Sequence, residues 1–223
     1  MTPPLALDID GTLTRPDGGI DPRVFDPLRE WDAPVIIATG KSFPYPVALC
    51  EFIGVPERVI AENGGVVLVD DEATIVGDDA AARRVTEELD EAGYGTGWGD
   101  VDTHNRWRET ELSVNRTTPL DELEDIATAN DQIVVDTGYA YHVKSATVNK
   151  GIGLEAACST LNIDPKSVVA IGDSANDVEL FEVAGHAAAV ANAADEARNA
   201  ADYVTENEYA DGVLEVLADV RPA

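Results

Sequence analysis

Five short apolar runs recur along the chain, and each ends in a hydroxyl, amide, carboxylate or glycine residue. Stretches with helical spacing of apolar residues separate most of these runs. The runs lie at residues 4–8, 34–40, 58–64, 167–173 and 186–192, and the helical stretches at 43–53, 152–161, 177–183 and 194–200. This alternation predicts an α/β fold, a doubly wound, Rossmann-like parallel sheet with helices on both faces. In such folds functional groups gather beyond the carboxyl ends of the strands, where Asp8, Thr39 and Asp173 fall.

The pattern changes between residues 78 and 147. Residues 80–92 and 120–129 have helical spacing, 109–115 alternate like a half-exposed strand, and 133–136 and 139–143 resemble a strand pair. This predicts an α+β cap domain with a one-sided antiparallel sheet, inserted into the parallel-sheet domain. The core domain is therefore expected to be discontinuous, with residues 1–77 and 148–223 in the core and 78–147 in the cap. A hairpin at 66–76 is expected to lead toward the cap.

The chain is strongly acidic, because 43 Asp and Glu residues against 15 Lys and Arg give a net charge of −28 over 223 residues. Such a surface repels nucleic acid and anionic membranes, so neither is expected as a partner. At about 1 M salt the Debye length is about 3 Å and self-repulsion is screened, so the composition predicts the cytoplasm of a salt-accumulating halophile. A disordered acidic chain is excluded because 44% of the residues are hydrophobic and recur in strand and helix patterns.

Cysteines and apolar segments agree with a cytoplasmic setting. Cys50 and Cys158 lie far apart in helical stretches, where they are expected to be small buried hydrophobic residues. No run approaches the roughly 20 apolar residues of a membrane span, and the first apolar run lacks the basic flank of a signal peptide. We expect a soluble monomer or homodimer.

Two carboxylates interrupt the first apolar run where its strand should end. In an extended backbone Asp8 and Asp10 point to the same side, and repulsion between unit charges about 4 Å apart is roughly 4 kcal/mol at an effective dielectric of about 20. A positive group is therefore expected beside them. A calcium loop is excluded, because Gly19 stands where its bidentate glutamate is required. Turn formation by the two aspartates is the structural alternative.

The other strand ends supply groups that complement these carboxylates. Thr39 can donate to an anionic oxygen, and Lys150 supplies a positive charge. Asp173 and Asp177 are four residues apart at the start of a helical stretch, so their side chains share a face. Hard carboxylate oxygens from two loops, with no cysteine beside them, are suited to Mg²⁺.

Four stretches, in order, resemble the four motifs of the haloacid dehalogenase-like (HAD) superfamily of phosphotransferases. They are DIDGT at 8–12, ATG at 38–40, the lysine of VNKG at 148–151, and GDSAND at 172–177. The insert, together with AENGG at 61–65, resembles the α/β-capped, Cof-like branch of that superfamily. Within this branch, the short cap and residues 49–65 most resemble the archaeal phosphoglycolate phosphatases.

The resemblance implies a role for each of these positions. It implies that Asp8 attacks phosphorus and forms an aspartyl-phosphate, and that Asp10 acts as general acid and then as general base. It also implies that Mg²⁺ is held by the Asp8 side chain, the Asp10 backbone carbonyl and Asp173, with Asp177 a ligand directly or through water. The residues implied to bind the phosphoryl group are Thr39, Gly40, Lys150 and Asn176.

The leading hypothesis is a phosphatase of a small phosphorylated metabolite, with 2-phosphoglycolate as substrate on the strength of the resemblance. One alternative is a sugar-phosphate or mannosyl-phosphoglycerate phosphatase of the same branch. A non-catalytic phospho-receiver and a binding module that has lost catalysis are alternatives of a different class. Lys41, Glu62, Asn63 and His142 are left open between a role in the site and a structural one, and His104 carries no motif.

Overall fold

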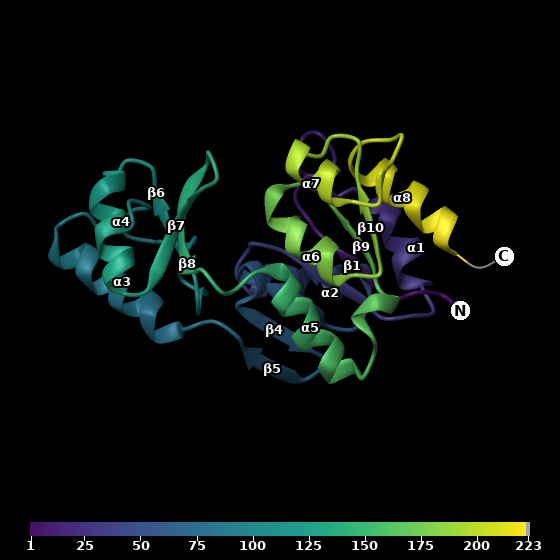
Figure 1. Cartoon of the computed structure of the whole chain (residues 1–223), viewed down its shortest axis with the longest axis horizontal. Coiled ribbons are helices and arrows are strands. Elements are labelled where there is room, and N and C mark those ends of the chain that lie inside the picture. The colour runs from purple at the N-terminus through teal and green to yellow at the C-terminus, as the bar shows by residue number, and fades with distance from the viewer. Residues whose placement is uncertain (222–223) are drawn as a thin grey trace.

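The computed structural model describes residues 1–221 and contains an eight-stranded sheet in the order β11-β10-β9-β1-β2-β3-β4-β5 (Figure 1). The strands are β1 (Leu5–Leu7), β2 (Val35–Ala38), β3 (Arg58–Ala61), β4 (Val66–Val69), β5 (Glu72–Ile75), β9 (Val169–Gly172), β10 (His186–Ala189) and β11 (Tyr203–Val204). Strands β11 to β3 pair in parallel, whereas β4 and β5 are antiparallel. Because β1 lies between β9 and β2, the polar ends of these three strands meet at one edge of the sheet.

Helices cover both faces of this sheet. The face that carries Leu5 and Leu7 packs against α1 (Phe25–Arg29), α2 (Pro44–Ile53) and α8 (Tyr209–Val220). The face that carries Ala6 packs against α5 (Lys150–Leu161), α6 (Val178–Val183) and α7 (Asp195–Ala200). Four short 3-10 turns join these elements, η1 (Pro22–Val24), η2 (Glu62–Gly64), η3 (Pro165–Ser167) and η4 (Ala175–Asp177). The expected α/β fold with a doubly wound sheet is therefore confirmed.

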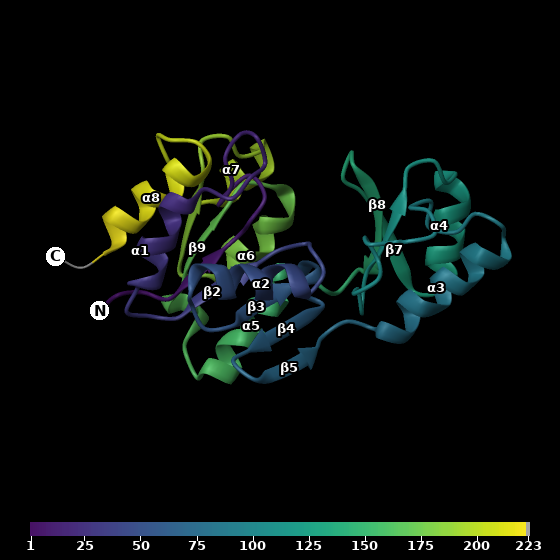
Figure 2. The ribbon, with the colours of Figure 1, turned by 180° about the vertical axis from the view of Figure 1, so that it is seen from behind.

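A second lobe, set apart from the first in Figures 1 and 2, contains a three-stranded antiparallel sheet in the order β6-β8-β7. Its elements are α3 (Asp79–Glu91), β6 (Leu112–Asn115), α4 (Leu120–Ala129), β7 (Gln132–Asp136) and β8 (Ala140–Ser145). One face of the sheet is buried against α3 and α4, where Leu89 and Leu123 pack with Tyr141 and Val143. We call this lobe the cap. Its one-sided sheet agrees with the sequence pattern, and the domain boundaries at 77/78 and 147/148 stay predictions.

The other face of the cap sheet is directed toward the core. Side chains alternate along β8, so Tyr141 and Val143 point to the helices while His142 and Lys144 point away from them. Val135 of β7 is paired with His142 and shares this face. Val135, His142 and Lys144 line the same cavity as the residues that follow β1 and β2. The cap sheet therefore faces the carboxyl ends of the core strands.

Two features near the C-terminus were not predicted from the sequence. Strand β11 has only two residues, and α8 follows it, with Val213, Val216 and Leu217 buried in the core.

Cys50 and Cys158 are buried and free, in separate parts of the core, as expected. Across residues 1–221, no helix has both the length and the apolar character that a membrane crossing requires.

Candidate active site

Asp8 lies directly after β1 and is 4% exposed. Lys150, the first residue of α5, is fully buried and donates from Nζ to Asp8 Oδ1 at 2.7 Å. The same Nζ donates to Asp177 Oδ1 at 2.7 Å and to Asn176 Oδ1 at 3.1 Å. Burial by itself lowers the pKa of Lys150, but the charges of Asp177 and Asp8 outweigh it and raise this pKa, so the lysine is charged. Lys150 is the positive group that the first strand end required.

Three carboxylates meet at this point. Asp8, Asp173 and Asp177 each offer an oxygen, and these oxygens lie within 4.8 Å of one another. Burial and the charge of Asp177 raise the pKa of Asp173 to about 6, and burial raises the pKa of Asp8 well above its usual range. Three acidic groups against one lysine leave an excess of negative charge that a hard divalent cation would neutralise. The donor set therefore fits Mg²⁺.

Asp177 also holds the loop that carries Asp173. Its Oδ2 accepts the backbone N–H groups of Asp173 and Ser174 at 3.0 Å each, while its Oδ1 accepts from Lys150. A Cβ atom on Gly172 would lie 2.5 Å from Asp177 Cγ, so only glycine leaves room for the carboxylate to fold back. Both oxygens of Asp177 thus have protein partners, and its part in holding a metal stays a prediction.

Asp10 occupies a turn beyond β1 rather than the strand itself. Its side chain is 58% exposed, and its Oδ2 pairs with Lys41 Nζ at 2.7 Å. The extended backbone expected from the sequence is therefore wrong at Asp10. Asp10 pairs with Lys41, whereas Asp8 pairs with Lys150. The turn requires Gly11, whose φ is +83° and where a Cβ atom would lie 2.0 Å from Asp173 Oδ2.

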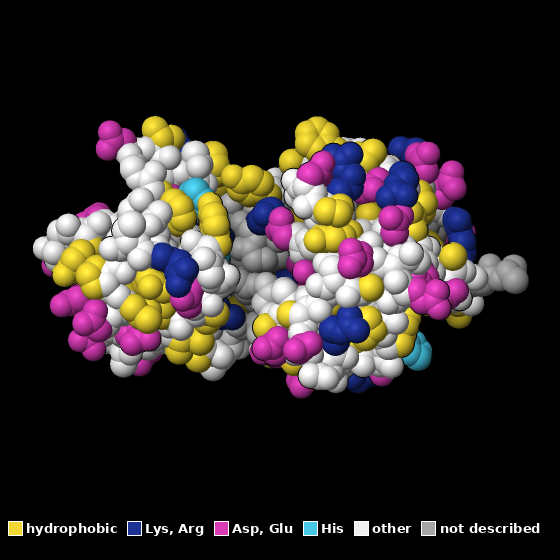
Figure 3. Space-filling model, turned by 90° about the horizontal axis from the view of Figure 1, so that it is seen from above, with side chains coloured by type: hydrophobic (Ala, Val, Ile, Leu, Met, Phe, Trp, Pro, Cys, Tyr) yellow, Lys and Arg dark blue, Asp and Glu magenta, His cyan; other side chains and the backbone are white. Residues whose placement is uncertain are grey.

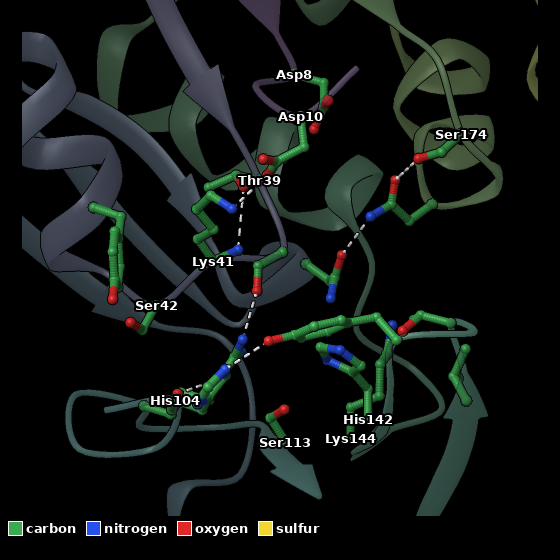
Figure 4. Close-up of a pocket in the computed structure, with 18 of the residues that line it drawn as sticks. Asp8, Asp10, Thr39, Lys41, Ser42, His104, Ser113, His142, Lys144 and Ser174 are labelled. Carbon is green, nitrogen blue, oxygen red and sulfur yellow. Dashed lines mark hydrogen bonds and ion pairs between the residues drawn. The ribbon is translucent and has the colours of Figure 1, made fainter. Parts of the chain in front are cut away.

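A cavity of about 630 Å³ lies between the core and the cap. Figure 3 shows the hollow between the two lobes, and Figure 4 shows the side chains that point into it from both. The predicted site residues that line it are Asp8, Asp10, Thr39, Gly40 and Asn176. Lys150 donates to Asp8 and Asn176 of this lining and also to Asp177. The structure thus brings together residues that the sequence separates by more than 160 positions.

A chain of hydrogen bonds leads from Lys150 across the cavity wall into the cap. Asn176 accepts from Lys150 and donates from Nδ2 to Asn63 Oδ1 at 2.9 Å. Asn63, at a φ of +52°, donates from Nδ2 to Glu111 Oε2 at 2.8 Å. Asn63 is therefore a connecting residue between the core site and the cap, which resolves one of the four open assignments.

Glu111 is the buried cap residue at the end of this chain. Its Oε1 accepts from Arg108 Nη1 at 3.2 Å and pairs with His142 Nδ1. Burial alone would raise the pKa of Glu111, but the Arg108 charge and the His142 contact hold it at about 2. Arg108 also donates from Nη2 to the carbonyl oxygen of Gly40 at 3.0 Å. Sequence reasoning missed Glu111 and Arg108. Neither the alternating pattern of 109–115 nor the residue before it indicates which core loop these side chains contact.

Glu62 joins the core to the cap through hydrogen bonds with the segment that leads into β6. Its carboxylate accepts the backbone N–H groups of Glu109, Thr110 and Glu111, at distances between 2.8 and 3.2 Å, and the Thr110 hydroxyl at 3.0 Å. Burial raises the pKa of Glu62, although these hydrogen bonds oppose the shift. Glu62 is thus a structural anchor rather than a cavity residue.

His104 is a cavity residue that carried no signal in the sequence. Its ring stacks on Trp98 with centroids 3.8 Å apart, and its Nε2 is 2.9 Å from the Tyr139 hydroxyl. His104 and Tyr139 both line the cavity on the cap side. His104 lies in the loop between α3 and β6 and Tyr139 in the turn between β7 and β8, so no periodic pattern could have joined them.

Curated proteins resemble this chain over nearly its whole length. The chain is 59% identical to a phosphoglycolate phosphatase of Natronomonas pharaonis over 99% of both chains. It is 53% identical to a phosphoglycolate phosphatase of Halobacterium salinarum, over 98% of this chain and 97% of the relative. Both relatives come from halophilic archaea, as the acidic composition predicts.

Solved structures share the fold at lower identity. The crystal structure of Thermoplasma acidophilum 0175 matches with a TM-score of 0.84 at 23% identity, over 99% of this chain and 98% of that one. A haloacid dehalogenase-like hydrolase from Bacteroides thetaiotaomicron matches with a TM-score of 0.76 at 19% identity, over 99% and 100%. The family model of the haloacid dehalogenase-like hydrolases matches residues 5–92 and 109–217. The chain therefore is an enzyme that belongs to the haloacid dehalogenase-like hydrolases, as its four motifs indicated.

Proposed function

We propose that the chain is a Mg²⁺-dependent phosphomonoesterase that hydrolyses 2-phosphoglycolate to glycolate and phosphate through an aspartyl-phosphate. The observation that carries this proposal is the buried contact of Asp8 with Lys150 at the edge of the cavity, next to Thr39. The names of the relatives, at 52% to 59% identity, support the substrate. Membership of a hydrolase family leaves the phospho-receiver alternative without support.

In the proposed reaction Asp8 is the nucleophile, and Asp10 is first the general acid and then the general base. A carboxylate oxygen of Asp8 forms a bond to phosphorus while the bond from phosphorus to the glycolate oxygen breaks, and Asp10 gives a proton to that oxygen. Asp10 then takes a proton from a water molecule, whose oxygen attacks phosphorus and releases phosphate from Asp8. The Asp10 side chain lines the cavity beside Asp8, where its carboxylate pairs with Lys41.

Other groups of the site bind the transferred phosphoryl group and hold its surroundings. Thr39 and the backbone at Gly40 face it from the end of β2, and Lys150 brings positive charge to Asp8. Mg²⁺ would be held by the Asp8 side chain, the Asp10 backbone carbonyl and Asp173, with Asp177 a ligand directly or through water. The cation would offset the negative charge that Asp8 and the phosphoryl group share.

A panel of phosphate esters assayed with Mg²⁺ in KCl tests the proposal. We expect the kcat/KM for 2-phosphoglycolate to exceed those for hexose phosphates and mannosyl-3-phosphoglycerate. A value no better than that for hexose phosphates would overturn the substrate assignment.

The covalent step has its own test in Asp8→Asn. This variant is expected to lose turnover of an aryl phosphate by at least about 10³-fold and to form no acyl-phosphate, because an amide cannot replace the nucleophilic carboxylate. Asp17→Asn, a change at an exposed aspartate that pairs with Arg15, is the matched control. Retained turnover in Asp8→Asn would show that the nucleophile is another group.

A further inference from the structure

Lysine is scarce in this chain, and its few lysines are not scattered. Fifteen Lys and Arg residues include only four lysines, at positions 41, 144, 150 and 166. Lys41 and Lys144 line the cavity, and Lys150 lies against Asp8 beneath it. A strongly acidic protein that has almost no lysine elsewhere therefore concentrates three ammonium groups around one cavity.

Three of the four lysines have identified partners. Lys41 pairs with Asp10, and Lys150 pairs with Asp8 and Asp177, each at 2.7 Å. Lys166 donates to the carbonyl oxygens of Glu182 and Ala184 at the end of α6. Within residues 1–221, the Lys144 side chain makes no hydrogen bond and no ion pair, although it is only partly exposed.

The position of Lys144 on β8 directs its side chain into the cavity. It lies two residues after His142 on the same face of the strand, and Ile133 is its partner on β7. Figure 4 shows Lys144 and His142 rising from the cap toward the core, with Asp8, Asp10 and Thr39 on the opposite side of the cavity. A ligand held by its phosphoryl group at the core thus presents its other end to this part of the cap.

Burial lowers the pKa of Lys144, the charges of Glu111 and Glu179 oppose this shift, and the charge of Lys150 adds to it. The Glu111 carboxylate is already bound by Arg108, His142 and Asn63. Within residues 1–221, neither Glu111 nor Glu179 forms an ion pair with Lys144. A partly desolvated ammonium group without a partner is disfavoured until an anion arrives.

We propose that Lys144 binds the carboxylate of the substrate and thereby selects small phosphorylated acids over phosphate esters with a neutral tail. This inference rests on the proposed phosphatase function and names the residue that binds the substrate's second negative group, its carboxylate. A cavity of about 630 Å³ is too roomy to select a small ester by shape alone, so selection by charge is the means available to it. A hydrogen-bonded carboxylate–ammonium contact has the required strength.

The test compares 2-phosphoglycolate with 2-hydroxyethyl phosphate, which has the same phosphoryl group but no carboxylate. Lys144→Gln is expected to lower kcat/KM for 2-phosphoglycolate about ten- to one hundred-fold, mainly through KM, and to leave 2-hydroxyethyl phosphate unchanged. Lys144→Arg should retain much of the preference, because it keeps the charge. Lys166→Gln removes the same charge away from the cavity and is the matched control. All assays use one KCl concentration, and a thermal melt confirms that each variant is folded.

The outcomes separate this inference from the function on which it rests. If the wild type hydrolysed both esters equally well, or if Lys144→Gln affected both alike or neither, the phosphatase proposal would stand and the role of Lys144 would be overturned. If the wild type hydrolysed no phosphate ester, the proposed function would fail first, and the role of Lys144 with it.

Discussion

Asp173 is the residue in which the unbalanced charge of the site is most evident. Its carboxylate lies beside those of Asp8 and Asp177, and its Oδ1 accepts from the Thr12 hydroxyl at 3.3 Å. Burial and the charge of Asp177 raise its pKa to about 6, which means that its ionised form destabilises the metal-free fold at neutral pH. A bound divalent cation would reverse this effect, because it favours the ionised form.

Asp173→Asn is therefore expected to raise the Tm of the metal-free protein at pH 7, while it abolishes the stabilisation by Mg²⁺. The amide removes the repulsion and keeps an oxygen that can accept from Thr12. Thermal melts of wild type and variant, in EDTA and in excess Mg²⁺ at the same KCl concentration, measure both effects. A lower metal-free Tm for the variant, or equal stabilisation of both proteins by Mg²⁺, would contradict the metal assignment.

At the scale of secondary-structure elements, two residues of the η2 turn join the core to the cap, beside the contact of Arg108 with Gly40. Glu62 of η2 accepts the backbone N–H groups that precede β6, and Asn63 donates to the side chain of Glu111, the last residue before β6. Both core residues have positive φ, at 51° and 52°, so η2 is held in a conformation that these contacts stabilise. The η2 turn thus contacts the cap through Glu62 and Asn63 and the core site through the hydrogen bond from Asn176 to Asn63.

Glu111→Gln is expected to lower the free energy of unfolding by about 3 kcal/mol at pH 7. The pKa of Glu111 is held at about 2, below its ordinary value of 4.5, so its contribution is present above pH 4.5 and is lost as the pH falls toward 2. The difference between variant and wild type should therefore shrink below pH 4.5. Urea unfolding between pH 7 and pH 3.5, at constant KCl, measures it.

Glu109→Gln is the matched control for this experiment, because Glu109 is an exposed glutamate two residues earlier in the same segment. It should change the unfolding free energy by no more than about 0.5 kcal/mol at any of these pH values. A constant difference between Glu111→Gln and wild type from pH 7 to pH 3.5 would show that the charge of Glu111 does not stabilise the cap contact.

The sequence predicted the elements better than the contacts between them. Strands such as β2 and β9 were located because a buried parallel strand is a continuous apolar run that ends in a polar residue. The link from Asn63 to Glu111 spans 48 residues and depends on how a loop of the cap meets a turn of the core. No periodicity encodes such a contact, so Glu111, Arg108 and His104 were found only in the structure.

At the scale of the whole molecule, the site is a cavity between two lobes of an acidic protein. The four motifs predicted which residues meet at the carboxyl ends of the strands, because three of the motifs follow parallel strands of one sheet. They did not predict the ion pair of Asp10 with Lys41, since it depends on the turn at Gly11. The cytoplasmic setting, the oligomeric state and the lack of nucleic-acid partners stay predictions of the composition.

The net charge of −28 makes the stability of the whole molecule depend on salt. We expect the Tm to rise steeply with KCl, because the Debye length shortens from about 10 Å at 0.1 M to about 3 Å at 1 M and screens the repulsion between exposed carboxylates. Sucrose at equal osmolality should stabilise the protein much less.

A variant with fewer exposed charges tests the same idea. It removes four exposed charges of α3 and α4, and its Tm should depend less on KCl; the changes are Glu87→Gln, Glu91→Gln, Glu124→Gln and Asp125→Asn. If the Tm of this variant rose with KCl as steeply as that of the wild type, or if the wild type were fully stable in dilute buffer, repulsion on the acidic surface would not be the cause of the salt dependence.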